Sequence, residues 1–153
     1  MHAFELKLPP PVVALITATL MWVVSSATPA LNFSFPASTA LAAILVLIGL
    51  GIDAAALISF RIARTTVNPM RPGHTSALVT SGIYCTTRNP MYLGMLLVLA
   101  GWSVTLSNPL AIVLLPVFVL YLNRFQIGPE EHILSGLFGK AYADYQARVR
   151  RWI

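Results

Sequence analysis

Two short polar segments of this chain carry the residue types that could bind a charged small molecule. The first, residues 86–94, sets Arg88 and Asn89 before Pro90 and opens directly into an apolar run. The second is the pair Glu130 and Glu131, which follows the next long apolar stretch. Guanidinium, amide and carboxylate groups bind charged and hydroxyl-bearing ligands. Because both segments adjoin apolar runs, we expect two loops that face each other at one bilayer surface and form a site rather than a pore.

The composition of the chain is that of an integral membrane protein. Hydrophobic residues make up 57% and charged residues only 10% of its 153 residues, against roughly 45–50% and 25% in soluble domains. A chain of this length has room for about four or five membrane-spanning helices of roughly 20 residues, with short loops. We therefore expect an all-α, polytopic membrane protein that forms a single domain over residues 1–153.

Charge and cysteine content argue against other ligand classes. The net charge of +5 would suit nucleic acid, but the basic residues lie at the ends of apolar segments and are not interleaved with aromatic residues. The anionic surface of a bilayer explains them better. The single cysteine, Cys85, cannot form an internal disulfide, and no Cys/His cluster predicts a metal site. We expect neither a metal nor a nucleic acid as a ligand.

Four apolar segments predict four spans, at about residues 11–30, 37–60, 90–106 and 109–127. Residues 65–89 form a long polar loop, and Pro90 suits the first turn of a helix, where its missing N–H would be unpaired anyway. Pro116 is expected to kink the fourth span, and Gly128 and Pro129 are expected to end it. Apolar residues at spacings of three or four then predict an amphipathic C-terminal helix over 129–153, interrupted at Gly139.

The basic residues also predict the orientation of the chain. With four spans, all ten Lys and Arg residues fall on one side of the membrane. The positive-inside rule then places both termini, the 65–89 loop and the active site in the cytoplasm. The first apolar segment is longer than the usual secretory signal core of about 7–15 residues, so we expect it to be retained as a span. The predicted location is the bacterial inner (cytoplasmic) membrane.

Two blocks of residues resemble a known family. The first comprises residues 78–84 and 87–94, and the second includes Glu130, Glu131, Phe138, Gly139, Tyr142, Tyr145 and residues 149–152. Together they cover roughly the C-terminal half of the chain, and their conjunction at this distance is specific. The chain resembles the isoprenylcysteine carboxyl methyltransferase and phospholipid methyltransferase family of small integral membrane methyltransferases.

The resemblance implies methyl transfer from S-adenosylmethionine, with S-adenosylhomocysteine as product. It also implies a cofactor pocket that faces the cytoplasm and an acceptor that arrives from the bilayer through a gap between helices. The acceptor classes are an isoprenylcysteine-like carboxylate, a lipid, or a small thiol or amine. S-adenosylmethionine carries a sulfonium, an ammonium, a carboxylate, ribose hydroxyls and adenine, so its site needs carboxylates, a cation and an apolar slot. The two blocks supply each kind of group.

The resemblance assigns roles to particular residues. The catalytic candidates are Arg88, Asn89 and Glu131. The cofactor-binding candidates are Thr80, Gly82, Tyr84, Asn89, Pro90, Tyr92, Gly94, Glu130, Glu131 and Arg150. Many relatives carry His where this chain has Asn89, which can hydrogen-bond a cofactor but cannot titrate. Ile83 and Cys85 replace the Pro and Arg that are often found in the loop of similar sequences.

Each of these candidates also has a structural explanation. The glutamates could simply complement the dipole at a helix N-terminus, and Arg88 could be a positive-inside anchor. Gly94 could serve ordinary packing of small residues between membrane helices. Arg150 and Arg151 could contact anionic headgroups. Asp53, near the middle of the second span, could serve function or structure, because an intramembrane carboxylate is costly.

Two rival functions remain open. Membrane sterol reductases have a related C-terminal architecture and bind a nicotinamide cofactor, although this chain is short for one. A non-enzymatic helical scaffold or transporter subunit would use Asp53 and Pro116, and would leave the Arg88 and Glu130–Glu131 clusters unexplained. For a methyltransferase, the sequence offers no convincing buried general base, which favours a carboxylate or an ionised thiolate as acceptor over an amine.

Overall fold

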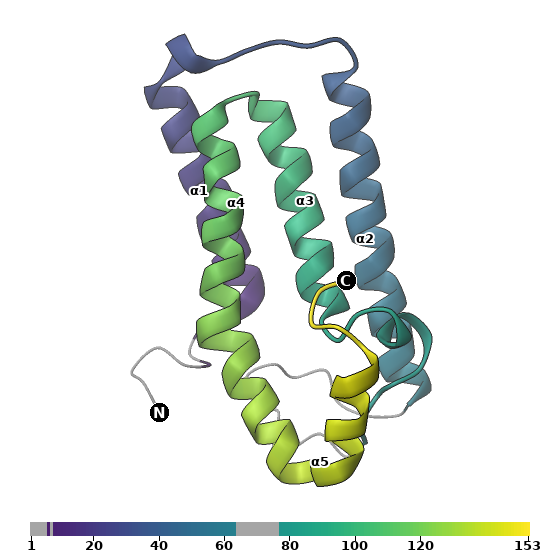
Figure 1. The fold of residues 1–153 in the computed structure, drawn as a ribbon. Coiled ribbons are helices and arrows are strands. Elements are labelled where there is room, and N and C mark those ends of the chain that lie inside the picture. Colours follow the sequence, from purple (N-terminus) through teal and green to yellow (C-terminus); the bar gives the residue numbers. More distant parts are fainter. Residues whose placement is uncertain (1–5, 7, 64–76) are drawn as a thin grey trace.

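The chain folds into a bundle of long apolar helices with a smaller cap at one end (Figure 1). The computed structural model describes Leu6, residues 8–63 and residues 77–153. Within these residues the long helices are α1 (Pro10–Ala27), α2 (Ser38–Ile62), α3 (Pro90–Leu106), α4 (Pro109–Leu122) and α5 (Gly128–Arg148), and no strand is found. Helices α1, α2 and the continuous α4–α5 helix are long and apolar enough to cross a membrane, and α3 is a shorter apolar helix. The predicted all-α, polytopic membrane fold is confirmed.

Helix α3 is the centre of the bundle. It packs against α1, α2 and α4, whereas α2 packs mainly against α3. Glycines make the α2–α3 contact close: a Cβ on Gly49 would lie 2.7 Å from the carbonyl oxygen of Gly94, and one on Gly101 would lie 2.8 Å from that of Ala42. Small residues allow this approach in membranes, where van der Waals packing drives helix association. The contact fixes the end of α2 beside the beginning of α3.

Polar side chains fasten the end of the bundle that lies far from the cap. Asn108 is fully buried, and its Nδ2 donates to Oδ1 of Asn32 at 2.7 Å and to the carbonyl oxygen of Thr28 at 3.2 Å. Its own Oδ1 caps α4 by accepting from the N–H of Leu110 at 2.9 Å. These bonds tie the chain after α1 to the α3–α4 turn. Buried polar groups in this setting need such partners.

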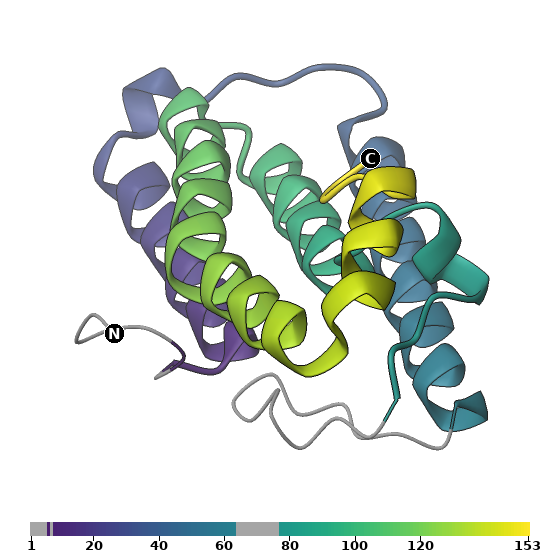
Figure 2. The same ribbon diagram turned by 60° about the horizontal axis from the view of Figure 1, so that its bottom comes forward.

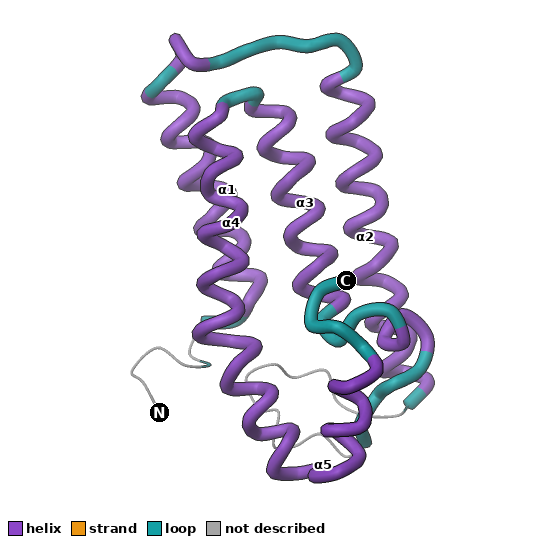
Figure 3. Tube along the Cα trace, in the orientation of Figure 1, coloured by secondary structure: helices purple, strands orange, loops and turns teal. Residues whose placement is uncertain are grey.

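The fourth span does not end at Gly128 and Pro129, contrary to the expectation from sequence. A π-helical turn over Asn123–Ile127 joins α4 directly to α5, and the helix runs on past Pro129 (Figure 3). Pro129 has no N–H to donate to the carbonyl oxygen of Phe125, four residues earlier, but the N–H of Leu6 donates to that oxygen at 3.1 Å. A partner from elsewhere in the chain thus replaces the missing helical bond.

The chain reverses later, at Gly139, where the sequence predicts an interruption of the C-terminal helix. Its φ of 49° and ψ of −121° break α5 into two helical arms, and glycine takes this conformation without a Cβ penalty. In the view from the cap end, the second arm returns across the bundle towards α2 and α3 (Figure 2). Pro116 lies inside α4, which continues beyond it to Leu122.

The remaining boundaries differ from the expected ones by a few residues. The first helix ends at Ala27 and is followed by a short 3₁₀ turn, η1 (Pro29–Leu31), while α2 extends to Ile62. Of the predicted 65–89 loop, residues 77–89 are described and contain the 3₁₀ turn η3 (Gly82–Cys85). Residues 64–76, with Arg64 and Arg71, lie outside the described residues, as does Lys7.

Candidate active site

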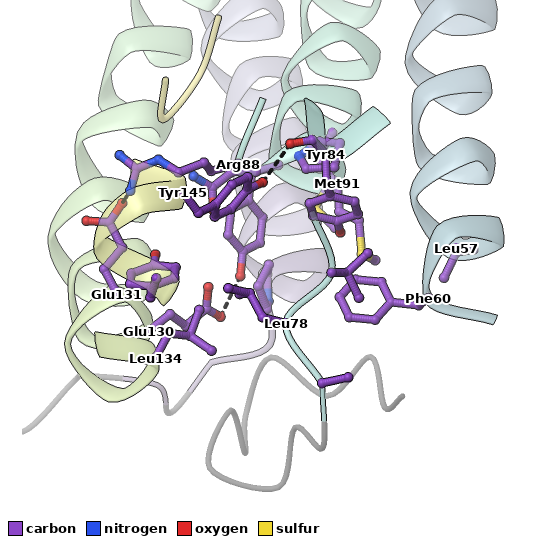
Figure 4. A pocket seen from close by; sticks show the side chains of 18 of the residues that line it. Leu57, Phe60, Leu78, Tyr84, Arg88, Met91, Glu130, Glu131, Leu134 and Tyr145 are labelled. Atoms are coloured by element: carbon purple, nitrogen blue, oxygen red, sulfur yellow. Dashed lines mark hydrogen bonds and ion pairs between the residues drawn. The ribbon is translucent and has the colours of Figure 1, made fainter. Parts of the chain in front are cut away.

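A pocket of about 380 Å³ lies at the cap end of the bundle. It is enclosed by the beginning of α1, the end of α2, the η3 segment, the beginning of α3 and both arms of α5. Figure 4 labels side chains from α2, from the segment before α3, from α3 and from both arms of α5 around the pocket. Its volume is in the range of small-molecule sites, about 300–1,000 Å³. Elements that are far apart in the sequence therefore build one cavity.

The walls of this pocket divide by chemistry. One part is apolar, with Leu57 and Phe60 from α2 and Met91 and Met95 from α3. The other part is polar, with Arg88, Asn89, Tyr92, Glu130 and Glu131. Such a combination of apolar surface with a few placed polar groups is typical of a binding site for an amphipathic ligand.

Glu130 is a buried carboxyl group with two hydrogen-bond donors on one oxygen. The hydroxyl of Tyr92 donates to Oε1 at 2.7 Å, and Nε2 of Gln126 donates to the same atom at 2.6 Å. Burial raises the pKa of Glu130 to about 7, with the neighbouring Glu131 charge acting in the same direction and the two hydrogen bonds opposing it. The sequence analysis names Glu130 as a candidate but does not predict that its carboxyl group is shielded from water and has a raised pKa.

The carboxyl group of Glu131 lies against two arginines. Nε and Nη2 of Arg151 lie 3.1 and 2.5 Å from its two carboxylate oxygens, a bidentate ion pair. Nη1 of Arg88 lies 3.1 Å from Oε1. Only 15% of the Glu131 side chain is exposed, whereas 39% of the Arg151 side chain is exposed, so water reaches the pair from the arginine side. The hydrogen bond with Glu131 correspondingly raises the pKa of Arg151.

Arg88 has donors to spare for a ligand. Its side chain is 12% exposed and lines the pocket. Among the described residues, Nε and Nη1 have no hydrogen-bond acceptor, since the approach of Nη1 to Glu131 is an ion-pair contact without hydrogen-bond geometry. Buried donors without acceptors are costly. An anionic group bound in the pocket would satisfy such a cation.

Three tyrosines complete the polar wall. The hydroxyl of Tyr145 donates to the carbonyl oxygen of Tyr84 at 2.7 Å and so fastens the second arm of α5 to η3. Burial raises the pKa of Tyr84, of Tyr145 and of Tyr142, so all three stay neutral at physiological pH. Their rings line the pocket beside Arg88.

Seven of the predicted site residues lie at this pocket: Tyr84, Arg88, Asn89, Pro90, Tyr92, Glu130 and Glu131. The two blocks recognised in the sequence are therefore adjacent in space. Pro90 begins α3 as expected, and its position turns Tyr92 towards Glu130. Whether each of these residues contacts a cofactor stays a prediction.

Four other predicted residues do not line the pocket. The carbonyl oxygen of Thr80 accepts from the thiol of Cys85 at 3.2 Å, which closes the η3 turn. Gly82 has a φ of 62° and packs on Ser59 of α2, so it supplies the turn that was expected of it without reaching the cavity. Gly94 faces Gly49 and Asp53 of α2, which is the helix-packing alternative.

Arg150 differs most from its predicted role. Its side chain is exposed, and only its carbonyl oxygen takes part near the site, by accepting from the N–H of Arg88 at 3.0 Å. Its neighbour Arg151 is the arginine that reaches Glu131. After α5 ends, the backbone is extended at Val149, and successive side chains along extended backbone point to opposite sides. The Arg150 side chain is thus exposed, while that of its neighbour Arg151 lies against Glu131.

Gln126 was missed in the sequence, whereas Asp53 was considered there with its role left open. Gln126 lies in the π turn, and this turn determines where its side chain points. The sequence pattern predicted a regular helix here, so it could not indicate the position of this side chain. Asp53 lies against Gly94 with Oδ1 buried and without a hydrogen-bond partner among the described residues, but it does not line the pocket. His132 is exposed.

Comparisons with known proteins give one family match and several relatives. A family model described as phospholipid methyltransferase matches residues 37–141. Protein-S-isoprenylcysteine O-methyltransferase A of Arabidopsis thaliana is 32% identical over 106 residues, 69% of this chain and 54% of the relative. The protein-S-isoprenylcysteine O-methyltransferase of Mus musculus is 39% identical over 75 residues, 49% of this chain and 26% of the relative.

A shorter relative is matched over its whole length. An uncharacterized protein of Haemophilus influenzae is 44% identical over 63 residues, which are 41% of this chain and 100% of that protein. By contrast, the matched regions span about a quarter to a half of the isoprenylcysteine methyltransferases from mouse and Arabidopsis.

Proposed function

Because the chain belongs to the phospholipid methyltransferase family, we propose that it transfers a methyl group from S-adenosylmethionine to a lipophilic or membrane-associated acceptor. The observation that carries this proposal is the single cavity in which Arg88 and Asn89 meet Glu130 and Glu131. These are the polar groups of both sequence blocks, and they adjoin an apolar wall that faces the bundle.

The residues of the pocket fit the proposed cofactor. The spare buried donors of Arg88 suit its carboxylate, Glu130 and Glu131 suit ribose hydroxyls or the ammonium, and the apolar wall with Leu78 and Tyr84 suits adenine. When bound, S-adenosylmethionine supplies an electrophilic methyl group on a sulfonium. The protein then has to align the acceptor and limit the access of water, and the apolar residues of the pocket wall suit both tasks.

Glu130 widens the range of possible acceptors. A carboxylate acceptor needs no base, whereas an ammonium or thiol must lose a proton before it can attack. With a pKa of about 7, the Glu130 carboxyl can take up that proton at physiological pH. We therefore propose that the Glu130 carboxyl group can accept a proton from the methyl acceptor. The acceptor classes then include lipid amines, thiols and isoprenylcysteine-like carboxylates.

Charge supports a cytoplasmic orientation of the site. The described basic residues, Arg61, Arg88, Arg124, Lys140, Arg148, Arg150 and Arg151, all belong to the cap end of the bundle, and the opposite turns at residues 28–37 and 107–108 carry no charge. The positive-inside rule then places the cap and the pocket in the cytoplasm. In this orientation the end of α2 and the apolar pocket wall meet the inner leaflet, from which a lipophilic acceptor would enter.

Methyl transfer can be assayed directly. The purified protein would be incubated with S-adenosylmethionine carrying a labelled methyl group and with phosphatidylethanolamine vesicles or a farnesylated cysteine derivative. We expect label in the organic phase with one of the acceptors, and its loss in the Glu131→Gln variant. No transfer to either acceptor or to a total membrane lipid extract would contradict the proposal.

A further inference from the structure

The chain after α5 turns back over the polar wall of the pocket. We call residues 149–153 the C-terminal tail. Val149 ends the helix in an extended conformation, with φ of −122° and ψ of 130°. The tail then runs to the beginning of α3, where the C-terminus lies in Figure 1. Hydrogen bonds on two sides hold the tail in this position.

On one side, the tail is bonded to the residues immediately before α3. The N–H of Arg88 donates to the carbonyl oxygen of Arg150 at 3.0 Å, and Nδ2 of Asn89 donates to that of Arg151 at 2.9 Å. The hydroxyl of Thr87, which is 1% exposed, also donates to the carbonyl oxygen of Arg151 at 3.3 Å. The amide donor of Asn89 is thus occupied by the backbone of the tail.

On the other side, the tail is bonded to the π turn. Nε1 of Trp152 donates to Oδ1 of Asn123 at 3.1 Å, and the Trp152 ring packs against the main apolar core. Val149 is buried with Tyr142 and Tyr145. The tail therefore bridges the beginning of α3, the second arm of α5 and the π turn. Arg151 lies between Arg150, which bonds to Arg88, and Trp152, which bonds to Asn123.

We propose that the tail is a strap whose seating by Asn89 and Trp152 positions Arg151 against Glu131. Asn89 and Trp152 are then positioning residues, and Asn89 acts through the tail rather than on the cofactor. The ion pair depends on this seating because 39% of the Arg151 side chain is exposed, and an exposed, flexible pair gains little unless its geometry is fixed. The effect on ligand binding rests on the proposed function, whereas the seating itself does not.

The first test measures the seating without any ligand. Hydrogen exchange of the full-length protein in detergent would be followed in the peptides that contain Arg88 and the tail. We expect about tenfold faster exchange in Asn89→Ala and in Trp152→Phe, which keeps the ring but loses the Nε1 donor. Arg148→Ala is the matched control, because Arg148 is exposed and, among the described residues, its side chain bonds to the carbonyl oxygen of Asp144 within α5. Unchanged exchange in both variants would overturn the strap.

The second test separates positioning from direct contact. Affinity for S-adenosylhomocysteine would be measured by calorimetry for Asn89→Ala, Arg151→Ala and the double variant. We expect each single change to weaken binding about tenfold and the double variant to bind no more weakly than Arg151→Ala, because both act through one contact. Fully additive losses would show that Asn89 contacts the ligand and would overturn its positioning role. If the unaltered protein binds no S-adenosylhomocysteine, the proposed function fails and the exchange measurement alone decides the strap.

Discussion

The hydroxyl of Tyr92, on the first turn of α3, donates a 2.7 Å hydrogen bond to Oε1 of Glu130 on the first turn of α5. These two residues come from separate sequence blocks, 38 positions apart. Gln126 donates to the same oxygen, which leaves Oε2 as the atom of Glu130 with fewer constraints. The polar wall of the pocket is thus built around a carboxyl group whose charge depends on pH.

This carboxyl group makes stability depend on pH. The pKa of Glu130 rises from 4.5 to about 7 because burial penalises the charged form. The folded protein therefore binds more protons than the unfolded chain between these values, so the stability from Glu130 is full below about pH 4.5 and is lost as pH rises through about 7. We expect the melting temperature to fall less between pH 5 and pH 8 in Glu130→Gln than in the unaltered protein. The corresponding difference in the free energy of unfolding is up to about 3 kcal/mol.

The measurement is a melting curve at several pH values for both proteins. Comparing the slopes cancels the titration of the groups that the two proteins share. Parallel curves for the two proteins would show that Glu130 does not titrate in this range.

Removing the Tyr92 hydroxyl tests the hydrogen bond to Glu130. This bond favours the ionised form and lowers the pKa of Glu130 against the larger effect of burial. Tyr92→Phe keeps the ring in place, so we expect the Glu130 titration to move to higher pH, by roughly one unit as for the loss of one hydrogen bond to a charged group. Melting curves at several pH values detect this change. A Glu130 titration that moves to lower pH in Tyr92→Phe would refute this role of the hydroxyl.

Two substitutions test the ligand-binding wall. Glu131→Gln removes the charge that Arg88 and Arg151 neutralise, and Arg88→Ala removes the cation with spare buried donors. We expect either change to weaken S-adenosylmethionine binding by roughly tenfold or more, since hydrogen bonds to charged groups are worth about 1.5–3 kcal/mol. Isothermal titration provides the affinities, and unaltered helical circular dichroism shows that the fold persists. Wild-type affinity in both variants would remove these residues from the site.

Gly94 serves helix packing in the structure, and this role can be tested apart from binding. A Cβ at this position would lie 2.8 Å from the carbonyl oxygen of Gly49 and would also meet the Asp53 carboxyl group. We expect Gly94→Ala to destabilise the protein by about 1–3 kcal/mol, as overpacking does. Gly136→Ala is the matched control, because nothing lies within 4 Å of a Cβ there and alanine favours a helix by about 1 kcal/mol. Equal effects of the two changes on chemical unfolding in detergent would contradict the packing account.

Much of the fold could be predicted because apolar runs and their breaks are local in the sequence. The long apolar helices, Pro90 as the beginning of α3 and Gly139 as the break in α5 all follow from hydropathy and backbone rules. The continuation of the helix past Pro129 could not be predicted, because it depends on the N–H of Leu6, more than a hundred residues away. Long-range partners of this kind leave no local pattern.

The candidate site was predictable to a similar extent. The resemblance to methyltransferases, confirmed by the family match, assigns Arg88, Glu130 and Glu131 to one site from their sequence blocks alone. It does not show which of Arg150 and Arg151 pairs with Glu131, because this depends on the path of the tail after α5. It also does not show that Glu130 is buried, because burial of a carboxyl group is set by the elements packed around it.

The central claim is that the pocket binds S-adenosylmethionine. Its most direct test is a thermal-shift titration of the detergent-purified protein with S-adenosylmethionine, S-adenosylhomocysteine and NADPH in parallel. A specific ligand stabilises the folded state in proportion to the logarithm of its concentration over its dissociation constant. We predict saturable stabilisation by the two adenosyl ligands and none by NADPH; stabilisation by NADPH alone would point to a reductase, and none by any ligand would contradict a cofactor site in this pocket.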